Sequence, residues 1–477
     1  MATFSKHFNL NKAQGELDFV DVRLNRDTPL FVDPFAISQR PDRWSQHAYT
    51  VLTSYFQKIV DFIRSGRQSD ARQLLSFLRE PNETRFGLSR KQPKGSGIGA
   101  FQADQLLKAL SASNAVRTGF LTSLEECELM IEGISWDKVS DLTTNAIRGE
   151  LAQYTADQCA LHGVPTQEVA LGAHFSLDVN DWVNDYLRLP VVSGKPVLLV
   201  PKAIARYEPA YDHREYHRNF ALRFLQNQHL SAGSSLVRAL KNGNRIVYKK
   251  DVQKILPCTK ERLFEFSKKN PTVLAEYRQH LAALEKKGNR SVVADEDEPA
   301  IASALIKALR SIPPGGGRAT EYHNLMIGII EIVFFPMLIH PVKEKEIHQG
   351  RKRIDIVMDN AATSGPLYVV HSVKKIPAAY IVFECKNYQT DIANPELDQI
   401  SSRFSANRGK VGFACCRRFE DRSLFVERCR DTFRDDRGLI VPLDDDTVVR
   451  WLELIRGNAR GAMSAAMSEA VNEICFS

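Results

Sequence analysis

From residue 301 onward, amphipathic stretches alternate with short apolar runs rich in β-branched residues, and this pattern restricts the fold more than any other feature. The periodicity predicts helices at 301–312, 319–335, 394–407 and 421–433, and strands at 342–350, 351–359, 378–389, 410–419 and 438–446. Alternating helices and strands pack as layers around one sheet. We therefore expect a C-terminal α/β domain with a central mixed sheet flanked by helices.

A chain of 477 residues is expected to form more than one domain. Within the first 200 residues helical periodicity predominates, at 46–65, 102–113, 117–133 and 138–162. The fold class is thus predicted as multi-domain α+β. The expected parts are a mostly helical N-terminal domain (1–200), a basic region (201–290), an acidic linker (291–300) and the C-terminal domain (301–477).

The net charge of +7 is concentrated in one segment. Residues 201–290 contain 19 Lys and Arg against 8 Asp and Glu, with aromatic residues among them. Cations release counterions from phosphates and aromatic rings stack on bases, so this composition suits nucleic acid. The candidate contacts are Arg214, Arg218, Lys249 and Lys250. The alternative, amphipathic helices with core aromatics and a solvated charged face, agrees equally well with the sequence.

The 8 cysteines are spread through the chain without C-x-x-C spacing, which is typical of reduced thiols. The first residues lack the apolar stretch of a secretory signal, and the most apolar run, 325–339, is too short to cross a bilayer. We therefore expect a cytoplasmic protein with no membrane partner.

Charged residues interrupt two of the predicted strands. Asp355 lies between two isoleucines, and Glu384 and Lys386 follow the apolar run at 380–383. Residues two apart in a strand share a face, and buried charges are costly unless they pair or bind a metal. Two carboxylates from adjacent strands can hold one Mg²⁺, beside which Lys386 can orient the attacking water. The alternative is an ion pair between Glu384 and Lys386 in an inactive domain.

The motif RID at 353–355, followed by ECK at 384–386, resembles that of the PD-(D/E)XK nuclease superfamily, and most of all its type IV restriction endonuclease branch. The resemblance covers about residues 315–450 and implies a restriction-endonuclease-like fold. It implies that Asp355, Glu384 and the backbone carbonyl of Cys385 bind Mg²⁺ or Mn²⁺. It also implies that Lys386 is the catalytic lysine.

The same resemblance implies catalytic residues on two helices. Members often carry a glutamate on the helix before the first strand, for which Glu321 is the better match and Glu331 the alternative. Gln399 matches a glutamine on the helix that follows the second motif. Arg353, close to the first motif acid, is a further candidate for contact with nucleic acid.

Together these expectations describe a metal-dependent endonuclease that hydrolyses phosphodiester bonds. By the resemblance, the substrate is DNA in preference to RNA, and the setting is bacterial antiviral or restriction-type defence. A homodimer would supply two active sites for the two strands of a duplex, and a defence-system partner protein would fit the same setting. The alternatives are a non-catalytic nucleic-acid-binding or regulatory protein on a nuclease-like scaffold, and an RNase or DNA-repair nuclease.

Overall fold

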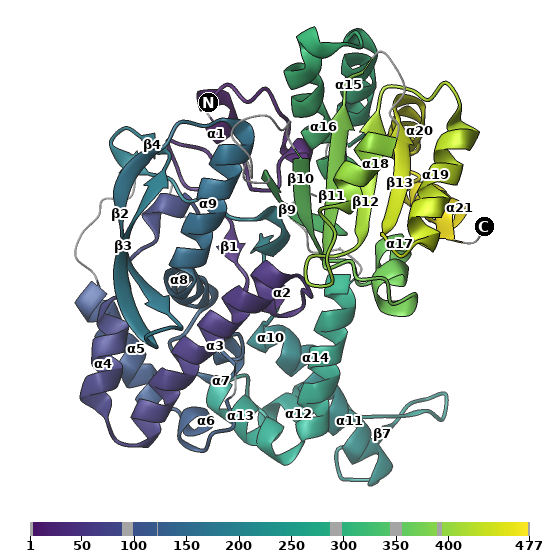
Figure 1. The fold of residues 1–477 in the computed structure, drawn as a ribbon. Coiled ribbons are helices and arrows are strands. Elements are labelled where there is room, and N and C mark those ends of the chain that lie inside the picture. Colours follow the sequence, from purple (N-terminus) through teal and green to yellow (C-terminus); the bar gives the residue numbers. More distant parts are fainter. Residues whose placement is uncertain are drawn as a thin grey trace.

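The computed structural model describes residues 3–87, 99–121, 123–286, 298–343, 355–388 and 394–475, with the backbone alone at 99–102, 355 and 394. It is a mixed α/β structure in two parts, each with its own hydrophobic core (Figure 1). One core extends from Phe4 to Leu281 and defines the N-terminal unit, residues 3–286. The other consists of Leu161 together with residues from Ala302 to Ile474, and it defines the C-terminal domain, residues 298–475.

A five-stranded mixed sheet forms the centre of the C-terminal domain, in the order β13-β12-β11-β10-β9 (Figure 1). The strands are β9 (Leu338–Lys343), β10 (Asp355–Asn360), β11 (Tyr380–Lys386), β12 (Val411–Cys416) and β13 (Leu439–Asp444). β10 runs antiparallel to β9 and to β11, whereas β11, β12 and β13 are parallel to one another. The prediction of a central mixed sheet is confirmed.

Helices flank this sheet on both faces. They are α15 (Glu298–Ser311), α16 (Ala319–Phe334), α17 (Gly365–Tyr368), the π-helical turn η6 (Val369–Val373), α18 (Asn394–Ser401), α19 (Arg422–Arg434), α20 (Asp445–Arg456) and α21 (Arg460–Cys475). On one face, the ring of Phe334 in α16 lies 5.1 Å from Phe383 and 5.0 Å from Phe413, which stack on each other. Because side chains alternate along a strand, Glu384 points to the other face, where α18 packs on β12.

Helices also make up most of the N-terminal unit. They are α1 (Phe4–His7), α2 (Pro34–Ser38), α3 (Arg43–Arg64), α4 (Gln68–Ser76), α5 (Gly99–Ala112), α6 (Asn114–Arg117), α7 (Cys127–Met130), α8 (Trp136–Ala146), α9 (Arg148–His162), α10 (His213–Glu215), α11 (Leu222–Ser231), α12 (Lys249–Ile255), α13 (Lys260–Lys269) and α14 (Pro271–Lys286). The periodic stretches at 46–65 and 102–113 are confirmed as α3 and α5. None of the described helices has the length and apolar character needed to cross a membrane.

The helical prediction at 138–162 is confirmed, with one break at Ile147, where the backbone leaves the helical conformation between α8 and α9. The prediction at 117–133 is wrong. Among the described residues of this stretch beyond Arg117, only the short α7 is helical.

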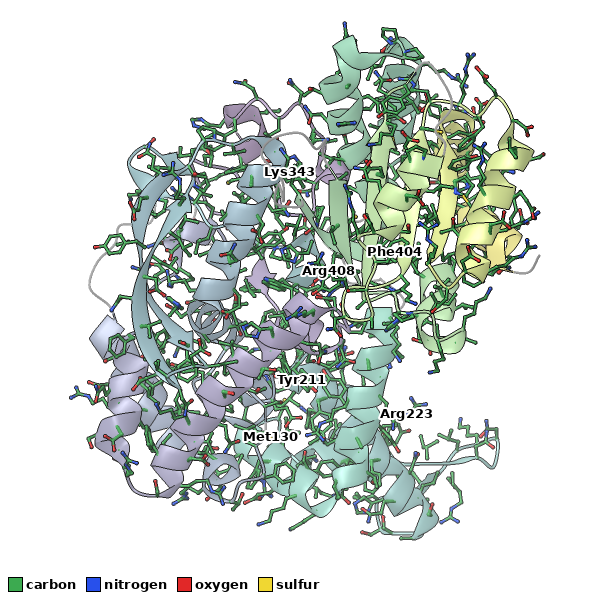
Figure 2. All side chains as sticks on the ribbon, in the orientation of Figure 1. Met130, Tyr211, Arg223, Lys343, Phe404 and Arg408 are labelled. Carbon is green, nitrogen blue, oxygen red and sulfur yellow. The ribbon has the colours of Figure 1, made fainter. Side chains whose placement is uncertain are left out.

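Short strands complete the N-terminal unit. The antiparallel hairpin of β2 (Gln167–Ser176) and β3 (Asp181–Leu189), which the sequence did not predict, packs on α8 and α9. The remaining pairs are β1 (Phe31–Val32) with β6 (Ala205–Arg206), β4 (Val191–Val192) with β5 (Lys195–Pro196), and β7 (Arg238–Ala239) with β8 (Arg245–Ile246). The β7–β8 hairpin turns at Asn242-Gly243, a dipeptide typical of hairpin turns, and projects away from the rest of the chain (Figure 2).

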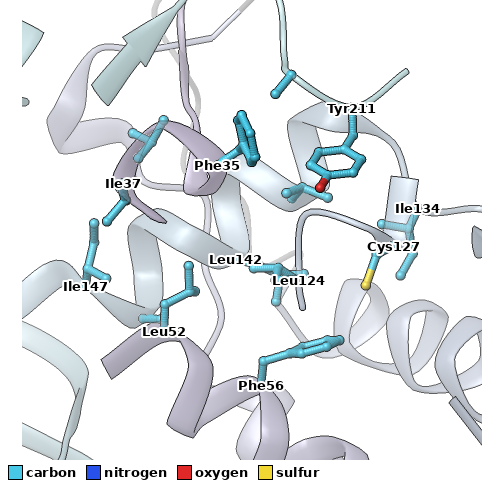
Figure 3. Packing of buried hydrophobic residues seen from close by; sticks show 14 of the residues in the cluster. Phe35, Ile37, Leu52, Phe56, Leu124, Cys127, Ile134, Leu142, Ile147 and Tyr211 are labelled. Atoms are coloured by element: carbon cyan, nitrogen blue, oxygen red, sulfur yellow. The ribbon is translucent and has the colours of Figure 1, made fainter. Parts of the chain in front are cut away.

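The predicted basic region shares its core with the first 200 residues. The ring of Tyr211 lies 5.4 Å from Phe35 and 5.9 Å from Tyr277, and Figure 3 shows Tyr211 beside Phe35 among the buried residues. The proposed division at residue 200 therefore does not coincide with a division between hydrophobic cores. The predicted linker at 291–300 falls mostly outside the described residues, and its last residues, from Glu298, begin α15.

The N-terminal unit covers the outer edge of the sheet. α9 lies beside β9, and the short turn η1 (Gln14–Glu16) lies beside α16. Gln158 Nε2 donates to the carbonyl of Pro341 at 3.0 Å, and the backbone N–H of His340 donates to Asp18 Oδ2 at 3.1 Å. Backbone groups of β9 thus find their partners in the other part of the molecule, which removes an exposed strand edge.

Candidate active site

The two motif strands place their acids at directly opposed positions. In the antiparallel pair of β10 and β11, Asp355 is the register partner of Glu384. Residues opposed in this way lie on one face of a sheet, with Cβ atoms about 4.5–5.5 Å apart in general. Spacing in the sequence related only Glu384 to Lys386, and the register adds Asp355 to the same face.

Glu384 is buried between two cations. Lys386 pairs with one of its carboxylate oxygens, and Arg403 Nη1 lies 2.7 Å from the other. The side chains of Glu384, Lys386 and Arg403 are only 2%, 5% and 8% exposed. Ionised groups are costly to bury unless they are paired. Glu384 therefore stabilises the two buried cations, and they stabilise its carboxylate.

The segment around α18 supplies two of the residues that surround the motif. Gln399 Oε1 accepts a hydrogen bond from Lys386 Nζ at 3.4 Å. Arg403 follows four residues later, a spacing that puts side chains on the same side of a helical segment. Buried Leu397 and Ile400 hold α18 against the sheet. Gln399 was predicted, whereas Arg403 was missed, although its spacing from Gln399 was a usable signal.

The carbonyl of Cys385, a predicted metal ligand, already has one partner. His323 Nε2 lies 2.7 Å from this oxygen, and the imidazole is buried. With the proton on Nε2, His323 donates to the carbonyl, whose second lone pair can accept another partner. His323 was not predicted, because a single histidine on an apolar helix has no motif that marks it.

Neither glutamate of α16 contacts Glu384 or Lys386 among the described side chains. Glu321 pairs with Arg318, and this hydrogen bond lowers the pKa of Glu321, whose side chain is about half exposed. Glu331 is buried and lies 3.2 Å from Lys202 Nζ. Glu331 therefore belongs to the contact between the two parts of the molecule.

A second arginine fixes the loop before α16 against the end of β11. Arg417 Nη2 donates to the Ile312 carbonyl at 2.7 Å, and Nη1 donates to Asn387 Oδ1 at 3.2 Å. Asn387 Nδ2 in turn donates to the carbonyl of Gly315 at 2.7 Å. Gly315 has a φ of 123°, a conformation that favours glycine. The loop thus lies beside the residue that follows Lys386.

Arg417 is held in place by two further contacts. Its Nε lies 2.8 Å from Asp445 Oδ2, and its guanidinium carbon lies 4.9 Å from the centroid of Tyr322. Burial raises the pKa of Asp445 to about 7, and the charge of Arg417 opposes this rise. No sequence motif marked this cluster, because its members come from separate helices and loops that are far apart in the sequence.

The basic candidates of residues 201–290 form one exposed surface. Arg214 belongs to α10, Arg218 to the π-helical turn η4 (Tyr216–Ala221), and Lys249 and Lys250 begin α12. Lys249 Nζ donates to the carbonyl of Arg218 at 3.0 Å, which joins the two clusters. We call Arg214, Arg218, Lys249 and Lys250 the basic surface. The remaining candidate, Arg353, lies outside the described residues.

Comparison with known proteins gives one match. The family model for a domain of unknown function, DUF8370, matches residues 9–212. The match covers less than half of the chain and ends before α10, so it includes neither the basic surface nor the candidate active site. No curated protein and no solved structure matches the chain.

Proposed function

We propose that the protein is a metal-dependent nuclease that hydrolyses phosphodiester bonds in DNA. The observation that carries this proposal is the register that sets Asp355 opposite Glu384, with Lys386 buried beside Glu384. Two acids and a lysine on adjacent strands of a mixed sheet are the arrangement expected from the PD-(D/E)XK resemblance. The same arrangement supports a restriction-endonuclease-like fold for the C-terminal domain.

The donors on these strands suit a small, hard cation. Asp355 and Glu384 would supply carboxylate oxygens and Cys385 a carbonyl oxygen, which are ligand types for Mg²⁺ and Mn²⁺. The described side chains include no cluster of three metal-ligating groups. Magnesium sites commonly use one or two carboxylates, with water and phosphate as the remaining ligands. When bound, the cation would polarise the phosphate and make bound water a better nucleophile.

Lys386 is the residue best placed to assist the attacking water. Its ammonium group is buried beside Glu384 and donates to Gln399, so its position is fixed. A fixed cation that is shielded from bulk water stabilises the charge that develops on a phosphate during attack. Arg403 contributes a second positive charge next to the same carboxylate.

The basic surface supports a nucleic acid as the substrate. Its four cations are exposed, and each phosphate that such cations neutralise releases counterions and adds affinity without regard to sequence. DNA is proposed over RNA because the resemblance is to restriction-type enzymes, and antiviral or restriction-type defence is the matching biological setting.

A non-catalytic nucleic-acid-binding protein is the second candidate function. The two cations around Glu384 favour it, because a carboxylate paired with Lys386 and Arg403 is satisfied without a metal. In that case the ion pairs contribute only to the specificity of the fold, and nucleic acid is bound but not cut.

Cleavage assays with the full chain test these alternatives. Plasmid DNA and single-stranded RNA are incubated in Mg²⁺, in Mn²⁺ and in EDTA. We expect metal-dependent DNA cleavage that falls by about 100-fold or more in Asp355→Asn, Glu384→Gln and Lys386→Ala, as for loss of a positioned catalytic group. Glu453→Gln and Lys307→Ala are matched controls, because both residues are exposed on helices α20 and α15.

Circular dichroism of each variant separates loss of chemistry from loss of folding. DNA cleavage that survives all three site substitutions would reject the proposed site. Binding of DNA with no cleavage in either metal would favour the second candidate, and cleavage of RNA alone would identify an RNase.

A further inference from the structure

A polar cavity of about 790 Å³ lies between the N-terminal unit and the C-terminal domain. Its walls come from the turn between α2 and α3, the last residue of α14, the end of β10, the α17–η6 segment and the start of β11. Figure 1 shows α2 and α14 reaching the end of the sheet at which β11 begins. The cavity is therefore separate from the candidate active site, because Glu384 and Lys386 lie four and six residues further along β11, roughly 13 and 20 Å away at about 3.3 Å per residue.

The charges around this cavity favour an anion. Arg40, Arg43 and Lys286 line it from the N-terminal unit. Among the described lining residues the single acid is Asp42, and its carboxylate is already engaged. One oxygen caps α3 by accepting from the backbone N–H of Ser45 at 2.8 Å, and the other lies 3.1 Å from Arg40 Nε. Asp42 therefore offsets Arg40, and the charge of Asp359, which does not line the cavity, acts on Arg43, so the balance of the three cations and two acids is still positive.

One donor of the Arg40 side chain is unpaired within the described part of the chain. The side chain is 12% exposed, and Nη2 is buried with no hydrogen-bond partner among the described residues. A buried guanidinium donor left unpaired is unfavourable, and an acceptor oxygen from a ligand in the cavity would relieve this. Phosphate oxygens are among the acceptors that arginine binds strongly, because the guanidinium can present two parallel donors.

The opposite wall suits a planar, apolar ring with polar edges. Tyr380 and Tyr368 line the cavity from the C-terminal domain, and Tyr368 is 38% exposed. The phenol oxygen of Tyr380 accepts from Arg43 Nη1 at 3.0 Å, which brings a ring and a cation together across the boundary between the two parts. Gln39 and Asn407 add amide groups to the lining. The volume falls within the range of small-molecule and cofactor sites, well above that needed for an isolated phosphate ion.

We propose that this cavity binds a nucleoside phosphate. The phosphate would lie on Arg40, Arg43 and Lys286, and the base would stack on Tyr368 or Tyr380. Such a ligand would bridge the N-terminal unit and the C-terminal domain. This nucleoside phosphate is either a free nucleotide or the end of a nucleic acid strand.

Binding is measured with the full chain by calorimetry in EDTA, where the proposed cleavage does not occur, so that this test is independent of the nuclease proposal. The probes are ATP, inorganic phosphate and a single-stranded 12-mer oligonucleotide. We expect ATP to bind and to lose about tenfold or more in affinity in Arg43→Ala and in Lys286→Ala, the scale of a lost charge-assisted hydrogen bond. Both residues are exposed, so neither substitution disturbs a core. Arg72→Ala, which removes an exposed, ion-paired arginine on α4, is the matched control.

The measured affinities distinguish a free nucleotide from the end of a strand, and they can also reject the proposed site. Oligonucleotide binding that depends on Arg43, without ATP binding, would assign the cavity to a strand end and support the same ligand class. If inorganic phosphate binds as tightly as ATP, the base adds nothing to the affinity, and the proposal of a nucleoside phosphate is overturned. ATP and oligonucleotide affinities that are absent, or unchanged in both cavity variants, would overturn the site.

Discussion

Lys202 and Glu331 form an ion pair across the boundary between the two parts of the molecule. Both side chains are 1% exposed, and Lys202 Nζ also lies 4.2 Å from the ring centroid of Phe335. Burial raises the pKa of Glu331, and the charge of Lys202 opposes that rise. Each charge is tolerated in this position only because the other is present.

Lys202→Met should lower the free energy of unfolding by about 3–5 kcal/mol, because it leaves Glu331 buried without its cation. The double variant Lys202→Met/Glu331→Leu should recover most of this loss, since apolar side chains of similar volume then replace both charges. Urea unfolding followed by circular dichroism measures both values. A double variant as unstable as the single one would show that the pair is not the source of the effect.

The residues of the candidate site differ in how far their arrangement can be predicted from nearby positions in the sequence. Glu384 and Lys386 share a face because of their spacing, which the sequence displays directly. The opposition of Asp355 to Glu384 depends on strand register across an interval that contains α17 and η6. His323 and Arg403 lie beside the motif because separate helical segments pack against it. A single sequence does not show which segments pack together.

Among the elements, those with a long apolar face or run were predictable. α15, α16 and α19, and the strands β11, β12 and β13, lie where periodicity placed them. Each buries one side or both in the second core, so its pattern is set by burial. The β2–β3 hairpin was missed because most of its residues are exposed or half-buried, which leaves little alternation to detect.

The basic surface leads to a prediction about α12. Lys249→Glu/Lys250→Glu should weaken DNA binding and lower the slope of log affinity against log salt by about 2, at roughly 0.9 per lost phosphate contact. The fold should tolerate both changes, because acidic residues are favourable in the first turn of a helix. Fluorescence anisotropy over a salt series measures the slope.

Lys307→Glu/Arg310→Glu on α15 is the matched control, since it changes net charge by the same amount at two exposed positions in the C-terminal domain. Equal losses of affinity in the two double variants would mean that overall charge, and not this surface, attracts DNA.

In the whole molecule, the contact between the two parts centres on polar groups around His340. Its Nε2 lies 3.5 Å from Asp157 in α9, and its Nδ1 lies 3.7 Å from Asp359 in β10. Burial alone would lower the pKa of His340, but the nearby carboxylates of Asp157 and Asp359 outweigh it and raise the value to about 10. Burial acts on the other partner as well, and raises the pKa of Asp359.

A histidine with a raised pKa stabilises the fold at pH values below its ordinary value of 6.5, and that contribution is lost as the pH rises towards about 10. The difference in unfolding free energy between wild type and His340→Asn should therefore be largest below pH 6.5 and shrink towards pH 10. Asparagine is the suitable replacement, because His340 has a φ of 54° and asparagine adopts this conformation readily. Urea unfolding across this pH range measures the difference, and a constant difference would contradict the assignment.

The cover over β9 determines how this chain can be divided. Gln158 and Asp18 each form a hydrogen bond with a backbone group of β9, and Ala203 packs against Ile339 of the same strand. A C-terminal domain produced alone would present this strand bare, and a second copy could add to it as an extra strand. Cleavage of the chain between residues 286 and 298 would, by contrast, leave β9 covered, because the contacts with the N-terminal unit would hold the two fragments together.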